Sequence, residues 1–295
     1  MVRTWLFAAA TLLAWVLGFG TAAAQTPAPD ALKLSVLTYN IRYDNLGDGE
    51  DRWEKRREQV YQLIRDHDPD VIGLQEALRG QLDDLGKALP VYGEIGVGRD
   101  DGKTKGEYAA ILYRKERFKV VDSGTFWFSD TPKVVASKGW GNNIVRICTW
   151  ARFKEREGPG EFWVYNVHLD HESQPSREKS SAMLAQRIGE RSPKVPVLVT
   201  GDFNSGEQNA AVKTMMKPDG AGLRDSFRIK YPEEKNVGTF NSFGKAAPGT
   251  EKIDYIFVEP GVVVRDAAID RRSKEGRFPS DHFAVWAKIE LPAAK

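Results

Sequence analysis

Several polar residues that could do chemistry stand next to short apolar runs, where a strand would begin or end. These residues are Asn40, Glu76, His168, Asp202, Asn204, Asp254, Asp281 and His282. Functional side chains commonly lie on loops held by a rigid sheet. Carboxylates, amides and imidazoles without cysteine suit a hard cation that prefers oxygen ligands, so this set favours Mg²⁺ or Mn²⁺ over zinc.

Such a set of groups suits the hydrolysis of a phosphate ester. A divalent ion offsets the charge on the phosphoryl oxygens and lowers the pKa of bound water. A general base and a general acid would each contribute roughly 10²–10⁴-fold. His168 and His282 could divide these proton transfers, and no Ser or Cys nucleophile is required.

The elements that must position these residues alternate at first between strands and helices, and the chain then becomes rich in strands. Apolar alternation predicts strands at 33–39, 71–74, 108–113, 118–128, 145–153, 161–169, 197–200, 253–258, 262–269 and 283–289. Helical spacing predicts helices at 53–66, 78–89 and 177–191. Two sheets packed face to face, with helices outside, fit this order and predict an α/β (α+β) fold.

Six segments in a fixed order carry a family resemblance. They are TYNIR at 38–42, GLQE at 73–76, NVHL at 166–169, GDFN at 201–204, IDYI at 253–256 and SDH at 280–282. Together they resemble the endonuclease/exonuclease/phosphatase superfamily over about residues 34–291. The resemblance implies a four-layered α/β sandwich, in which helices flank two packed mixed β-sheets, and a metal-dependent phosphoric ester hydrolase.

The resemblance also implies a metal site. Glu76 corresponds to the principal metal carboxylate, Asp281 to a second ligand, and Asn40 lies close by. Some members carry an aspartate two residues after the first asparagine, where this chain has Arg42. A second metal on that side is therefore in question.

The catalytic residues that the resemblance implies are Tyr108, His168, Asp202, Asn204, Asp254 and His282. Asp202 and Asn204 would orient the attacking water and the phosphate. Asp254 would fix the tautomer of His282, and His168 would be a second catalytic histidine. The match of Tyr108, as a hydroxyl facing the phosphate, is looser.

Simpler interpretations of single residues remain open. Asp202 lies in a Gly-Asp-x-Asn sequence that also favours a turn, and Asn40 could cap a loop. Asp254 could belong to a structural ion pair, because a buried charge needs a partner. Residues 55–57 are typical of a solvated helix face, and Trp140 in a polar loop could stack on a substrate or act as a lid.

The first residues have the composition of a secretory signal peptide. Arg3 precedes an apolar run that ends in three alanines at 22–24, so 1–24 is expected to be cleaved. A membrane anchor is the alternative, although the run is short for one. Residues 25–32 would be a linker and 33–295 a single catalytic domain, exported to the periplasm or secreted, with no membrane span after cleavage.

The charge and cysteine content limit which partners and sites the protein could have. With 43 Lys+Arg and 41 Asp+Glu, the net charge of +2 lacks the cationic excess of a nucleic-acid wrapper, so no stable nucleic-acid partner is expected. The single cysteine, Cys148, excludes an intramolecular disulfide and a cysteine-based zinc site. We expect a monomeric phosphodiesterase that acts on a phosphate ester of unknown class. A DNA or RNA nuclease, or a non-catalytic phosphate-binding protein with the same fold, are the alternatives.

Overall fold

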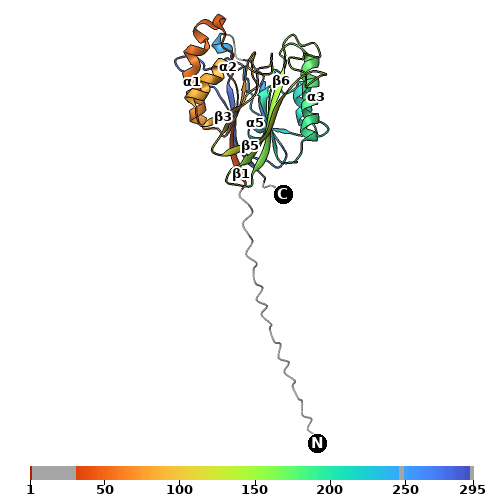
Figure 1. The fold of residues 1–295 in the computed structure, drawn as a ribbon. Helices are drawn as coiled ribbons and strands as arrows, with labels where there is room; N and C mark the ends of the chain where they lie inside the picture. Colours follow the sequence, from red (N-terminus) through yellow and green to blue (C-terminus); the bar gives the residue numbers. More distant parts are fainter. Residues whose placement is uncertain (2–30, 246–248, 293–295) are drawn as a thin grey trace. The chain divides into compact units, whose positions relative to one another are not determined.

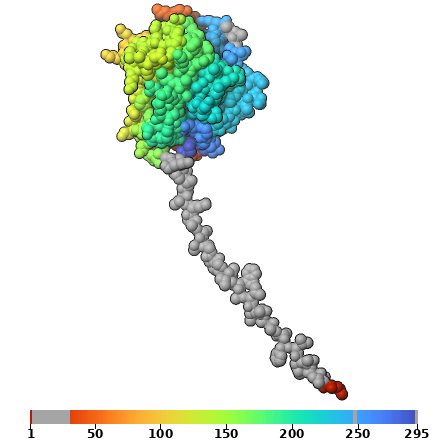
Figure 2. All heavy atoms as spheres, turned by 90° about the vertical axis from the view of Figure 1, so that its right-hand side faces the viewer, coloured from red at the N-terminus to blue at the C-terminus, as the bar shows by residue number. Residues whose placement is uncertain are grey.

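The computed structural model describes residue 1, residues 31–245 and residues 249–292. The chain from Ala31 onward forms one compact unit, which Figure 2 shows from the side of helix α3 (Gln174–Glu190). The predicted signal peptide, and the linker up to residue 30, lie outside the described residues. Among the described residues, no helix is both long and apolar enough to cross a membrane.

The first sheet has six strands in the order β11-β12-β1-β2-β4-β3. Their bounds are β11 Val263–Asp270, β12 Ala284–Leu291, β1 Leu32–Asn40, β2 Val71–Gln75, β4 Ile111–Arg114 and β3 Tyr92–Ile95. β1 pairs parallel with β2 and antiparallel with β12. This pairing brings the end of β1, the end of β2 and the start of β12 to the same edge of the sheet.

The second sheet has six strands in the order β5-β6-β7-β8-β10-β9. Their bounds are β5 Phe118–Trp127, β6 Ile147–Glu155, β7 Glu161–His168, β8 Val197–Asp202, β10 Asp254–Val258 and β9 Arg224–Asp225. β7 pairs parallel with β8, and β10 pairs antiparallel with β8. The ends of β7 and β8 and the start of β10 therefore meet at one edge.

Apolar side chains hold the layers together. Val36 of β1 and Ile256 of β10 belong to a buried cluster that joins the inner faces of the two sheets. Helices α1 (Trp53–His67) and α2 (Arg79–Ala88) cover the outer face of the first sheet. Helices α3 and α4 (Ala210–Met216) cover the second (Figure 1). This arrangement confirms the predicted four-layered α/β sandwich with two mixed sheets.

The remaining elements are short and carried no clear pattern in the sequence. They are β3, β9, α4, helix α5 (Ser226–Lys230) and the 3₁₀ helices η1 (Leu46–Asp51) and η2 (Ser242–Gly244). The strand predicted at 108–113 begins at Ile111, and Tyr108 makes only an isolated bridge to Ala77. Its apolar residues continue before the strand because that segment packs against the core without pairing along its length.

Arg56 corrects the prediction of a solvated helix face at 55–57. Its side chain is buried, with a residue exposure of 2%, and the guanidinium donates to four backbone carbonyl groups, among them that of Asp51 at 2.8 Å. It bonds to the carbonyl oxygens of Ile41 at 2.6 Å, Arg42 at 2.7 Å and Pro279 at 2.9 Å. Arg56 thus ties the segment after β1 to the loop before β12, the two segments that carry Asn40 and Asp281.

Candidate active site

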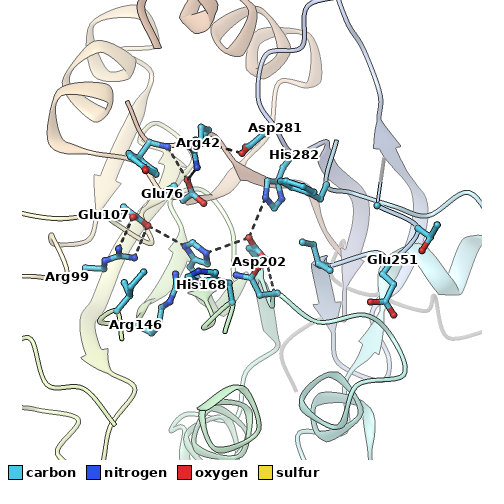
Figure 3. Close-up of a pocket in the computed structure, with 18 residues that line it drawn as sticks. Arg42, Glu76, Arg99, Glu107, Arg146, His168, Asp202, Glu251, Asp281 and His282 are labelled. Carbon is cyan, nitrogen blue, oxygen red and sulfur yellow. Dashed lines mark hydrogen bonds and ion pairs between the residues drawn. The ribbon is translucent and has the colours of Figure 1, made fainter. Parts of the chain in front are cut away.

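The register of the strands collects the predicted residues at one edge of both sheets. Asn40 is paired with Gln75 across β1 and β2, which places Glu76 next to Asn40. His168 is paired with Asp202 across β7 and β8, and Asp202 with Asp254 across β8 and β10. They surround or underlie a pocket of about 720 Å³ (Figure 3).

Two carboxylates converge at one side of this pocket. Arg42 Nη1 lies 3.9 Å from Glu76 Oε2, and Arg42 Nε lies 3.8 Å from Asp281 Oδ2. Burial and the charge of Glu76 raise the pKa of Asp281, while His282 and the two nearby arginines oppose the rise. A cation bound between the two carboxylates would relieve this repulsion, so the two predicted metal carboxylates form a suitable donor set.

Arg42 is held mainly by another acid. Its Nε and Nη2 each donate to Asp48 at 3.0 Å, and its backbone has a φ of 54°. The contacts with Glu76 and Asp281 are longer than hydrogen bonds. A fixed positive charge therefore lies where some family members carry an additional carboxylate.

Asn40 joins the metal side to the catalytic side. Its Nδ2 donates to Glu76 Oε1 and to Asp202 Oδ2, both at 3.0 Å, and its Oδ1 accepts from the Arg42 N–H at 3.0 Å. The side chain is fully buried. These bonds orient both carboxylates, and the role of Asn40 as a metal ligand stays a prediction.

Asp202, His282 and Asp254 form a line of buried side chains. His282 Nδ1 lies 3.0 Å from Asp254 Oδ2, and His282 Nε2 lies 3.8 Å from Asp202 Oδ2. Burial alone would lower the pKa of His282, but the charge and hydrogen bond of Asp254 outweigh it and raise that pKa well above its usual value. Burial, and then the charge of Asp254, raise the pKa of Asp202 to about 7.

The same three residues also satisfy the distance requirement of a metal site. One ligand atom from each of Asp202, Asp254 and His282 lies within 4.8 Å of the other two. Asp254 does not line the pocket, however, and its Oδ2 already accepts from the His282 ring. This geometry favours a carboxylate–imidazole pair.

His168 lies on the other side of Asp202. Its Nε2 is 3.7 Å from Asp202 Oδ2, and its Nδ1 is 3.7 Å from Glu107 Oε2. Burial and the positive charges of Arg146 and Arg99 hold the pKa of His168 well below its usual value. The pKa values of the two histidines are thus shifted in opposite directions, downward for His168 and upward for His282.

Asn204 is placed beside Asp202 by a tight turn after β8. Its N–H donates to Asp202 Oδ1 at 2.8 Å, and its φ is 46°. Its side-chain amide donates to the Leu169 carbonyl at 3.0 Å. Asn204 lines the pocket together with Asp202, as a pair that contacts water and phosphate requires.

Tyr108 lies elsewhere, which corrects its expected position. Its hydroxyl donates to the Lys103 carbonyl oxygen at 2.8 Å, and its buried ring packs among core residues of the first sheet. The residue does not line the pocket. Trp140 does not line it either, because its ring nitrogen donates to Asp130 at 2.9 Å.

Several pocket residues escaped the sequence analysis, among them Arg99, Glu107, Arg146 and Phe240. Arg99 donates twice to Glu107, at 2.7 Å each, and the Phe240 ring lies 5.2 Å from the His282 ring in an edge-to-face arrangement. The only available signal was the position of Arg146, directly before the apolar start of β6.

Comparison with known proteins agrees with this fold. The model of the Endonuclease/Exonuclease/phosphatase family matches residues 37–282, so the chain belongs to this family. A solved endonuclease/exonuclease/phosphatase from Bacteroides vulgatus is 38% identical with a TM-score of 0.80, covering 88% of this chain and 99% of that one. A mannosyl-6-phosphatase from Bacteroides thetaiotaomicron is 37% identical with a TM-score of 0.78, covering 87% and 99%. An uncharacterized protein of Acanthamoeba polyphaga mimivirus is 29% identical over 70% of this chain and 80% of its own length.

Proposed function

We propose that this protein is a divalent-metal-dependent phosphoric ester hydrolase that acts on a small substrate. The observation that carries the proposal is the placement of the Asp202–His282–Asp254 line beside the convergent carboxylates of Glu76 and Asp281 at one end of both sheets. Metal ligands and proton-transfer groups thus meet at a single pocket.

Glu76 and Asp281 would hold the ion. Their carboxylate oxygens suit Mg²⁺ or Mn²⁺, and the chain offers no cysteine ligand there. When bound, a divalent ion offsets charge on the phosphoryl oxygens and lowers the pKa of coordinated water.

The other residues act on the water and the phosphate. Asp202 and Asn204 are positioned to orient the attacking water, because both line the pocket and bond to each other. His282, oriented through Nδ1 by Asp254 and with a raised pKa, would hold a proton at Nε2 and stabilise negative charge on the phosphate. His168, whose pKa is lowered, would accept or donate a hydrogen bond at Nε2.

Two observations bear on the substrate class, and they favour different phosphate esters. The sequence favours a phosphodiester of modest size, since the near-zero net charge opposes tight binding of long nucleic acid. The 37% identical mannosyl-6-phosphatase favours a sugar phosphate instead. A pocket of about 720 Å³ has room for either substrate.

The test is hydrolysis of a substrate panel by wild type and Glu76→Gln. The panel contains 4-nitrophenyl phosphate, bis(4-nitrophenyl) phosphate, mannose 6-phosphate, RNA and plasmid DNA. Wild type should require Mg²⁺ or Mn²⁺, and Glu76→Gln should lose turnover by orders of magnitude. Glu94→Gln is the matched control, because Glu94 pairs with Arg79 outside the pocket.

Unchanged turnover in EDTA would refute the metal requirement. A Glu76→Gln variant that binds phosphate as wild type does, with no turnover in either protein, would identify a non-catalytic binding protein. Rapid cleavage of plasmid DNA at physiological salt would favour the nuclease alternative. We also propose that the protein is exported after cleavage of residues 1–24 and acts as a monomer, on the sequence grounds given above.

A further inference from the structure

Arg146 lines the pocket and carries one buried hydrogen-bond donor without a partner among the described residues. The residue lies just before β6, and its side chain is 3% exposed. Its Nε donates to Asp170 Oδ2 at 3.4 Å, and its Nη2 bonds to His171 Nδ1 at 2.8 Å. The third nitrogen, Nη1, has no hydrogen-bond partner in the described part of the chain, although it is buried.

The two contacts fix the orientation of the guanidinium group. Asp170 is itself held by the N–H groups of Glu172 at 3.0 Å and Ser173 at 2.6 Å, at the start of α3. The Arg146 side chain is therefore braced by a rigid element. A buried donor without a partner is costly, so a braced and unpaired N–H at a pocket indicates a ligand acceptor.

Within the described chain, Arg146 differs from the other arginines of the pocket in having a buried terminal nitrogen without a partner, whereas the unpaired buried nitrogen of Arg99 is its Nε. Both terminal nitrogens of Arg99 donate to Glu107, and two nitrogens of Arg42 donate to Asp48. Arg146 and Arg99 line the pocket on the side of His168 (Figure 3). Arg146 thus combines a positive charge with a free N–H on the side opposite the convergent carboxylates.

We propose that Arg146 binds a non-bridging oxygen of the substrate phosphate and makes the enzyme prefer phosphomonoesters to phosphodiesters. This inference rests on the proposed function and narrows its substrate class. Guanidinium groups match the geometry of phosphate oxygens and form strong charge-assisted hydrogen bonds with them.

The preference follows from the atoms around phosphorus. A monoester has three non-ester oxygens and carries nearly two negative charges above about pH 7, whereas a diester has two such oxygens and one charge. If the metal side of the pocket and His282 each engaged one non-ester oxygen, a monoester would still offer a third, anionic oxygen to Arg146. A diester would place an ester oxygen and its carbon against the buried guanidinium, whose N–H would stay unpaired.

The experiment compares two substrates with the same leaving group, 4-nitrophenyl phosphate and methyl 4-nitrophenyl phosphate, at saturating Mg²⁺ and pH 8. Arg146→Gln should lower kcat/KM for the monoester by roughly 10- to 100-fold, the value of a hydrogen bond to a charged group. The diester should change by less than about threefold, because it makes no such bond. Arg146→Lys should lose less, in the same direction.

Arg152→Gln serves as the matched control. Arg152 lies on β6, the strand that follows Arg146. It pairs with Glu161 at 2.6 Å, outside the pocket. It should leave the ratio of the two kcat/KM values unchanged. Thermal unfolding of each variant reports on any loss of the Asp170 contact.

Equal losses on both substrates would overturn the proposal. A small cavity of about 10 Å³ beside Arg146 and His168 is near the lower limit for one water, and such a water would give Arg146 a purely structural role with equal losses. A second measurement does not depend on turnover: calorimetric binding of inorganic phosphate and of dimethyl phosphate. Arg146→Gln should weaken phosphate binding about tenfold or more and leave dimethyl phosphate unchanged. If wild type hydrolyses neither ester, the proposed function fails, and phosphate binding alone decides the role of Arg146.

Discussion

Removing the charge of Asp254 tests whether it is a partner of His282 or a metal ligand. Asp254 is fully buried, and its Oδ2 lies 3.0 Å from His282 Nδ1. In the proposed arrangement the carboxylate accepts from Nδ1–H of His282 and favours the charged form of the ring. Asp254→Asn would remove the charge, and its amide could donate to Nδ1 and select the wrong tautomer.

The structure sets the size of the effect. Loss of an oriented acid–base group costs on the order of 10²-fold or more in kcat, which corresponds to about 2.7 kcal/mol. If the new amide turned its oxygen to His282, its NH₂ group would replace Asp254 Oδ1, which has no hydrogen-bond partner among the described residues. A buried unpaired donor would then lower the free energy of unfolding by about 1–3 kcal/mol.

The assay is a Mg²⁺ titration of activity for wild type, Asp254→Asn and Glu76→Gln, with thermal unfolding measured in parallel. Asp254→Asn should lower the rate at saturating Mg²⁺ and leave the half-saturating concentration nearly unchanged. Glu76→Gln should raise the Mg²⁺ requirement. The opposite pattern for Asp254→Asn, with a normal saturating rate and a raised Mg²⁺ requirement, would make the Asp202–Asp254–His282 cluster the metal site and refute our assignment.

Two further predictions concern stability. Burial would raise the pKa of Asp270, but hydrogen bonds from His67 at 2.7 Å and from Arg272 outweigh it and hold that pKa well below its usual value. Asp270→Asn should therefore lower the free energy of unfolding by about 1–3 kcal/mol at pH 7. The difference from wild type should shrink as the pH falls below about 4. Urea unfolding at pH 7, 5 and 3 measures this difference, and a value that stayed constant would contradict the linkage to the Asp270 carboxylate. Gly73→Ala should cost about 1–3 kcal/mol by overpacking, because its Cβ would overlap Thr200 Oγ1 and Asn166 Oδ1 between the sheets. Gly86→Ala, on the open surface of α2, is the control for thermal unfolding and should not lower the midpoint.

The long elements were predictable because each has a strong periodic signal of its own. In β1, Leu34 and Val36 are buried while Lys33 is exposed, so 33–39 appears in the sequence as an alternating pattern. The weaker elements lack such a signal. β9 has only two residues, and its pairing with β10 depends on the sheet that is already there.

The gathering of the proposed metal-binding and proton-transfer residues at one place was also predictable. Each follows or precedes a strand, and strands of two sheets that end at one edge bring such residues together without a local signal. The expected position of Tyr108 was wrong, because the apolar run around it does not pair as a strand up to the pocket. An apolar run alone therefore did not place the hydroxyl.

Contacts between segments far apart in sequence explain what remained hidden. Arg56 looks like a surface residue within its helix, yet it binds carbonyl groups 15 and 223 positions away in the chain. Arg146 likewise owes its orientation to Asp170 and His171, 24 and 25 positions away. A charged residue in a helix or at a strand end has no local mark of such partners, so burial in the fold is what separates these two arginines from ordinary surface arginines. The two then differ in one respect that bears on function. Arg56 bonds to the carbonyl groups of the chain itself, whereas Arg146 lines the pocket with one terminal nitrogen unpaired among the described residues, the nitrogen that we propose for the substrate phosphate.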